Sequence, residues 1–131
     1  MTHAPVRFAS VARLAAVCAM LALGTSAAQA GQWGAISVDL EKADMNPYYG
    51  VGGGASEEEA VANGQKFCEQ SGGAHCKNVV TYEQCGAYAA SKSAGGWGKA
   101  PSKKTAEIQA MAGCADDSCK LVVSDCNDDA Q

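Results

Sequence analysis

Seven cysteines are the residues of this 131-residue chain whose type and spacing carry the most chemistry. Six of them lie between positions 68 and 126, and the seventh, Cys18, lies in an apolar N-terminal segment. Cysteines in this number form disulfide bonds in an oxidising compartment or hold a zinc ion. Zinc spacing is missing, because there is no CxxC pair and His75 is the only histidine after the N-terminal segment. We therefore expect three disulfide bonds and no metal ion or other cofactor. The six cysteines are Cys68, Cys76, Cys85, Cys114, Cys119 and Cys126.

The first 30 residues have the layout of a secretory signal peptide. An apolar run, LAAVCAMLALG at positions 14–24, is preceded by two arginines and followed by the A-x-A cleavage site Ala28-Gln29-Ala30. The run is shorter than the roughly 20 residues that a membrane-spanning helix needs. Lipidation at Cys18 is disfavoured because the bulky Val17 precedes it. We expect cleavage after residue 30 and a single periplasmic or secreted domain, residues 31–131, without a membrane anchor.

The expected mature domain is acidic. Without the two arginines of the signal segment it has eight Lys and Arg against fourteen Asp and Glu, a net charge of −6. Nucleic acid is disfavoured as a partner, because nucleic-acid-binding domains carry a basic surface. The acidity favours a basic protein partner instead.

The sequence contains an internal repeat. CKNVV at 76–80 returns as CKLVV at 119–123, and the similarity extends upstream of both segments. Repeat one spans about 33–82 and repeat two about 85–126, so the mature chain is predicted to be a tandem duplication. The further matching segments are 56–60 with 102–106, Cys68 with Cys114, 33–38 with 85–90 and 49–52 with 96–99.

Each repeat is predicted to have the order β-β-α-β. In repeat one, residues 35–38 and 79–82 are β-prone, and the glycine-rich segment 49–54 is a weak strand or turn. Ser56 and Glu59 have the spacing of a capping box at the start of a helix. The fold class is therefore α+β, a small disulfide-stapled domain with two helices and a mostly antiparallel or mixed sheet.

Apolar spacing predicts which face of the first helix is buried. That face contains Ala60, Val61, Gly64, Phe67 and Cys68. The apolar residues of the second helix are small and spread around it, and they are Ala106, Ile108, Ala110, Met111 and Cys114. Trp33 and Trp97 head comparable segments and are expected in the core.

The repeat also suggests a disulfide map. In both repeats a helix that ends in cysteine is followed by a strand that begins with cysteine, which pairs Cys68 with Cys76 and Cys114 with Cys119. The remaining pair, Cys85 with Cys126, is expected to bridge the two halves. A core this rich in alanine needs such staples.

Several segments taken in order resemble the DUF4189 family of small exported bacterial proteins. They are WGAISVD, a Tyr-Gly before a glycine-rich turn, a Ser-Glu-Glu helix that ends in cysteine, CKNVV, CGAYAAS, GGWG and CKLVV. The resemblance covers Trp33 to Cys126 and implies an exported α/β domain. It transfers no catalytic residue, because the family has no assigned activity. The chain departs from the family pattern in the low aromatic content around Ala89-Ala90 and in the insertion Leu40 to Pro47.

Catalytic and metal-binding motifs are absent from the sequence. His75 is expected to be a turn histidine, and neither GxSxG nor HExxH occurs. Asp125, Asn127 and Asp129 echo the start of a calcium loop without its glycine and final glutamate, so residues 126–131 are expected to be a frayed acidic tail. Glu57 to Glu59 are expected to be a solvated helix start, and Lys77 and Lys120 to face solvent.

Two classes of function remain. The first is an exported, non-enzymatic binding protein with an unidentified protein partner, inhibition of or immunity to an exported toxin being one form. The second is an enzyme that acts on envelope material through acids such as Asp39 or Glu83. An exposed apolar or aromatic patch would favour binding, and a pocket of converging carboxylates would favour chemistry.

Overall fold

The computed structural model describes residues 33–41 and 46–127. The expected signal peptide lies outside the described residues, as does Asp129. Within residues 33–41 and 46–127, two helices and six strands confirm the α+β class, and each half has the order β-β-α-β. The elements are β1 (Trp33–Asp39), β2 (Tyr49–Gly54), α1 (Glu57–Gln70), β3 (Cys76–Tyr82), β4 (Cys85–Ala90), β5 (Gly95–Ala100), α2 (Lys103–Cys114) and β6 (Lys120–Cys126).

The six strands divide into two antiparallel sheets. One has the order β2-β1-β3 and the other β5-β4-β6, so each repeat builds its own sheet around its first strand. The sequence predicted a mostly antiparallel or mixed sheet, and the structure has two sheets that are both antiparallel. A three-stranded sheet closes within each repeat because every strand is antiparallel to its neighbour and the helix connection returns the third strand to the first.

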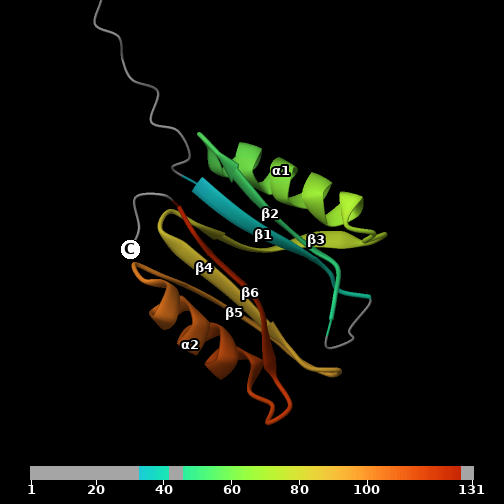
Figure 1. Cartoon of the computed structure of the whole chain (residues 1–131), viewed down its shortest axis with the longest axis vertical. Helices are drawn as coiled ribbons and strands as arrows, with labels where there is room; N and C mark the ends of the chain where they lie inside the picture. The colour runs from blue at the N-terminus through green and yellow to red at the C-terminus, as the bar shows by residue number, and fades with distance from the viewer. Residues whose placement is uncertain (1–32, 42–45, 128–131) are drawn as a thin grey trace, which may run out of the picture.

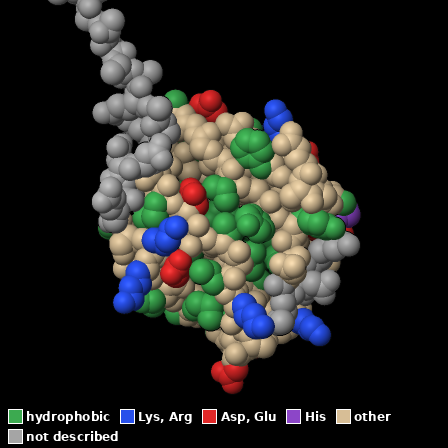
Figure 2. All heavy atoms as spheres, in the orientation of Figure 1, with side chains coloured by type: hydrophobic (Ala, Val, Ile, Leu, Met, Phe, Trp, Pro, Cys, Tyr) green, Lys and Arg blue, Asp and Glu red, His purple; other side chains and the backbone are tan. Residues whose placement is uncertain are grey.

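The sheets pack face to face with the helices outside (Figure 1). Helix α1 packs on β2 and β1, and α2 packs on β5 and β4. Large apolar side chains fill the space between the sheets, and Figure 2 shows hydrophobic side chains along the middle of one face, where the sheets meet. This inter-sheet core contains Ile36, Val38, Val80, Tyr82, Tyr88 and Ala90.

Glycines let each helix lie directly on its sheet. A Cβ atom added to Gly52 would lie 2.1 Å from the Gly64 nitrogen, and one added to Gly98 would lie 2.2 Å from the Ala106 oxygen. Gly50 and Gly52 face α1 in the same way as Gly96 and Gly98 face α2. Val51 of repeat one therefore corresponds to Trp97 of repeat two. The correspondence expected between 49–52 and 96–99 is therefore wrong by one residue.

Small residues also form the buried face of both helices. In α1 they are Ala60, Gly64 and Cys68, and in α2 they are Ala106, Ala110 and Cys114. Phe67, which was expected on the buried face of α1, is exposed, and so are Ile108 and Met111 of α2. There is no room for them, since the sheet lies against the helix backbone.

A serine cap begins each helix, and the cap of α1 was expected from the sequence. The Ser56 hydroxyl accepts a hydrogen bond from the Glu59 amide at 3.2 Å, and the Ser102 hydroxyl accepts one from the Thr105 amide at 3.3 Å. The Glu59 carboxylate accepts from the Ala55 amide at 2.9 Å, one residue before the expected partner. The capping box therefore starts α1, with its reciprocal bond shifted by one position.

Trp97 contradicts the expectation that both tryptophans lie in the core. Its side chain is 53% exposed on β5, and Trp33 is only partly buried. Lys77 and Lys120 face solvent as expected. Among the described residues, no helix is long and apolar enough to cross a membrane.

Candidate functional site

Two disulfide bonds occupy the same place in the two repeats. Cys68–Cys76 joins the last turn of α1 to the start of β3, and Cys114–Cys119 joins the end of α2 to the residue before β6. Their Cα atoms are 6.1 and 6.3 Å apart. These are the pairs that the repeat suggested, and each fixes the turn between a helix and its following strand.

The third disulfide bond, Cys85–Cys126, has the expected partners and a different location. Cys85 begins β4 and lies opposite Cys126 of β6 in the same sheet, with 4.0 Å between the Cα atoms. The bond therefore lies inside repeat two and does not bridge the halves. Trp33 and Glu83 hold the corresponding positions in repeat one.

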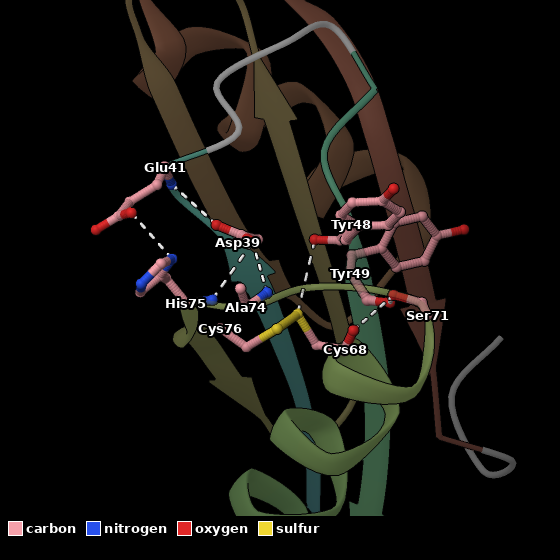
Figure 3. The surroundings of a disulfide bond; sticks show 9 residues. All are labelled: Asp39, Glu41, Tyr48, Tyr49, Cys68, Ser71, Ala74, His75 and Cys76. Atoms are coloured by element: carbon pink, nitrogen blue, oxygen red, sulfur yellow. Dashed lines mark hydrogen bonds and ion pairs between the residues drawn. A yellow bond between two sulfur atoms is a disulfide. The ribbon is translucent and has the colours of Figure 1, made fainter.

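The Cys68–Cys76 bond lies beside a buried carboxylate (Figure 3). Asp39, which is 2% exposed, ends β1 and accepts a hydrogen bond from the Ala74 amide at 2.9 Å and from the Glu41 amide at 3.1 Å. His75 forms a 2.9 Å ion pair with the exposed Glu41. Asp39 thus holds the turn before β3 in place, and His75 is the turn histidine expected from the sequence.

In repeat two, other residues hold the turn between the helix and the following strand. Ser91 takes the place of Asp39 at the end of the first strand and donates a hydrogen bond to the Asp116 carboxylate at 3.0 Å. Asp116 also accepts from the amide and hydroxyl of Ser118 and from the hydroxyl of Ser93. These bonds, led by that from the Ser118 amide, lower the pKa of Asp116 to about 2. Both carboxylates therefore order a turn beside a disulfide bond.

The acids proposed for an enzymatic site do not meet. Asp39 ends β1, whereas Glu83 follows β3 at the opposite end of that sheet, where Gly34 pairs with Tyr82. A seven-residue strand separates these ends by roughly 20 Å. Asp39 and Glu83 therefore belong to different parts of the surface.

Two surface hollows lie at these opposite ends. One of about 430 Å³ is lined by Trp33, Glu83 and Lys99 among others, and it contains one carboxylate. The other, of about 220 Å³, contains Asp39 and Ser91, whose polar atoms bind the turns described above. Neither hollow gathers the converging carboxylates expected of the enzymatic alternative.

Two of the three residues that resemble the start of a calcium loop, Asp125 and Asn127, form hydrogen bonds within the domain. Asp125 accepts a hydrogen bond from Tyr82, and the Asn127 side chain donates to the Glu83 carbonyl oxygen at 2.7 Å. Cys126 and Asn127 are thus fixed, which corrects the expectation of a tail frayed from residue 126. Within residues 33–41 and 46–127, no group of three or more His, Cys, Asp or Glu side chains could hold a metal ion.

Three exposed aromatic side chains lie at the end of α1 that carries the Cys68–Cys76 bond. Tyr48, Tyr49 and Phe67, here called the aromatic surface, are 38%, 41% and 46% exposed. The Ser71 hydroxyl donates to the Tyr49 carbonyl oxygen at 3.1 Å (Figure 3). Gly72 lies against the ring of Tyr48. Gly50 faces the α1 backbone at Phe67, and the side chain of its neighbour Tyr49 therefore points to the other face of β2.

The fold does not require this aromatic surface. The corresponding positions of repeat two are Ala94, Gly95 and Gly113, and that repeat forms the same sheet and helix. Sequence reasoning missed the surface because the apolar spacing placed Phe67 in the core. A position-by-position comparison of the two repeats is the signal that could have found it.

Comparisons with known proteins gave one finding. The model of a family described as a domain of unknown function (DUF4189) matches residues 33–126, which include both repeats and the six cysteines that form disulfide bonds. No curated protein and no solved structure matches the chain.

Proposed function

The chain belongs to the DUF4189 domain family, and from that premise we propose that it is an exported, non-enzymatic binding protein that recognises a protein partner through the aromatic surface of Tyr48, Tyr49 and Phe67. Export is supported by the three disulfide bonds, which persist in the periplasm or outside the cell and are rare in the cytosol. The signal-peptide layout of the first 30 residues agrees with this location.

One observation carries the proposal. Repeat one exposes three aromatic rings where repeat two has alanine and glycine, so the rings serve something other than folding. Tyrosine is among the residues that contribute most energy at protein interfaces, because its ring buries a large area for a small loss of side-chain entropy. The rings thus have the chemistry of an interface anchor.

The surface is held rigid before any partner arrives. Cys68–Cys76 and the Asp39 carboxylate fix the turn after α1, and the Ser71 hydroxyl ties the end of the helix to the Tyr49 backbone. A preorganised surface loses less entropy on binding and binds more tightly for a given contact area.

Charge favours a basic partner. Glu41 and Glu69 are exposed at the same end of the domain, and the expected mature chain has a net charge of −6. Arginine or lysine side chains of a partner could meet both the carboxylates and the faces of the tyrosine rings.

Affinity capture with matched variants tests the proposal. The oxidised mature chain is immobilised, and proteins bound from envelope and culture-medium extracts are quantified by mass spectrometry. A partner is expected that the double variant Tyr49→Ala, Phe67→Ala fails to retain, because both anchors are lost. Trp97→Val, which removes an exposed aromatic ring on β5, should retain it. Equal recovery by all three proteins, or no specific protein with any, would overturn the proposal.

A further inference from the structure

A second exposed apolar surface lies on the opposite helix. Ile108 and Met111 lie on the outside of α2, 59% and 39% exposed, and Leu121 of β6 is 42% exposed beside them. With Lys104 and Glu107 these side chains line a shallow hollow of about 500 Å³. Ile108, Met111 and Leu121 are here called the α2 strip.

Folding does not require the α2 strip to be apolar. The matching positions in repeat one are Ala62, Gln65 and Asn78, so one large apolar side chain is replaced by alanine and the other two by polar side chains. The same fold is thus built once without a large apolar side chain at these positions and once with three. Apolar side chains in water favour burial against a partner, because covering them releases ordered water.

The charges at the two ends of α2 are reversed relative to its dipole. Lys103 and Lys104 lie in the first turn, where the helix end is positive, and Asp116 and Asp117 follow its negative end. Repeat one has Glu57, Glu58 and Glu59 in the first turn, the favourable arrangement. In the described part of the chain, the one ion pair is His75 with Glu41, so neither Lys104 nor Asp117 has an ionic partner there.

We propose that the α2 strip binds a second copy of this chain, with the two α2 helices antiparallel across a two-fold axis. Antiparallel pairing brings the lysines of each copy to the aspartates of the other, which relieves the unfavourable ends of both helices. An axis between Ile108 and Met111 places Ile108 of each copy against Met111 of the other.

The same two-fold axis brings opposite charges of the two copies close together. Residues whose numbers are equally far from the axis face each other, so Lys104 lies opposite Ala115 of the second copy, two residues from Asp117. The lysine side chain is long enough to reach that carboxylate. A single surface thus offers apolar contact at its centre and opposite charges at its ends, which is the self-complementarity that a two-fold interface requires.

The dimer is expected to be reversible. A helix of 12 residues is about 18 Å long, and one such helix with part of β6 gives an interface at the small end of the range for specific complexes. Association should therefore depend on protein concentration and weaken with salt, since exposed charges contribute to it. This inference is independent of the proposed function, because the aromatic surface lies on repeat one.

Sedimentation equilibrium of the oxidised mature chain at several concentrations tests the proposal. The mass is expected to rise from monomer toward dimer. Met111→Gln and Leu121→Asn, which copy the residues of repeat one, should each raise the dissociation constant at least about tenfold, because each substitution removes two buried apolar contacts per dimer. Phe67→Ala, an exposed apolar residue on the other helix, should leave the constant unchanged.

Charge reversal tests whether the α2 strip binds a second copy of this chain or a different partner. Lys104→Glu alone and Asp117→Lys alone should each weaken the dimer, and the double variant should restore it to within about threefold of the original constant, because the opposite charges are exchanged between copies. Thermal melts check that each variant folds. A monomer at every concentration, a Met111→Gln variant that dimerises like the original, or additive losses in the double variant would each overturn the proposal.

Discussion

The Tyr82 hydroxyl donates a 2.5 Å hydrogen bond to a carboxylate oxygen of Asp125, and these two residues hold the same position in the two repeats. The segments CKNVVTY and CKLVVSD align them, so the bond joins the halves near their axis of internal symmetry. The ring of Tyr82 also covers Gly34 and Gly86, a second matched pair, and a Cβ atom on either glycine would lie 2.2 Å from it. One copy of the repeat supplies the donor and the other the acceptor. No disulfide bond among the described residues joins the halves, so this contact and the inter-sheet core hold them together.

Tyr82→Phe should destabilise the domain by about 2 kcal/mol, the order expected for a partly buried hydrogen bond to a charged group. Burial, and next the hydrogen bond to Asp125, raise the pKa of Tyr82 above its ordinary value, so the donating form persists over the accessible pH range. Urea unfolding measures the change. Tyr88→Phe is the control, because Tyr88 is equally part of the inter-sheet core and its hydroxyl has no hydrogen-bond partner among the described residues. Equal losses in the two variants would contradict a specific role for the Tyr82–Asp125 bond.

Replacing Cys85 and Cys126 with serine should lower stability more than removing either other disulfide bond. The bond closes a loop of 41 residues, against 8 and 5 for the other two. Chain-entropy estimates give about 4 kcal/mol for the long loop and about 2 to 3 kcal/mol for each short one. Thermal unfolding of the three paired Cys→Ser variants under oxidising conditions ranks the losses. An unchanged melting temperature for the Cys85/Cys126 variant would refute this ranking.

Gly52→Ala should destabilise the domain by about 3 kcal/mol or prevent folding, because its Cβ atom would lie 2.1 Å from the α1 backbone. Gly53→Ala is the matched control. Its Cβ atom would meet only the Trp33 carbonyl oxygen, at 3.7 Å, which is an ordinary contact. Circular dichroism and urea unfolding of the two variants compare them. If Gly52→Ala were as stable as Gly53→Ala, the close approach of helix and sheet would be wrong.

Asp116 should make stability depend on acid pH. Its pKa is lowered from 3.8 to about 2 in the folded chain, so the unfolded chain binds its proton first as the pH falls. The stabilising contribution is complete above the unfolded value and is lost as the pH falls from about 4 to about 2. Asp116→Asn should flatten the stability profile over this interval, as followed by urea midpoints. A profile unchanged by Asp116→Asn would contradict the assignment.

Some of the fold could be predicted because it depends on neighbours in the chain. The serine caps of α1 and α2 act across three residues, and the short disulfide loops close where a helix end and the next strand start must lie close together. The repeat itself is visible as a pattern of cysteines and valines. These features do not depend on which helix or sheet packs against which.

Other features could not be predicted, because they depend on what covers each face. Apolar spacing marks Phe67 as a residue of a buried face, and it cannot show that a glycine-lined sheet lies too close to admit its ring. The long disulfide was misplaced for a related reason. Its location depends on β4 pairing with β6, and pairing between distant strands is a property of the assembled sheet.

The sequence by itself determined the α+β class, the tandem repeat, the cysteine partners and the DUF4189 family. The tertiary structure alone decided that the strands form two sheets, that Tyr82 meets Asp125 across the halves, and that the aromatic surface and the α2 strip remain exposed. The difference is physical. Local hydrogen bonds and chain connectivity act over a few residues and leave their pattern in the sequence, whereas exposure is fixed only when packed layers exclude water from one side of each element.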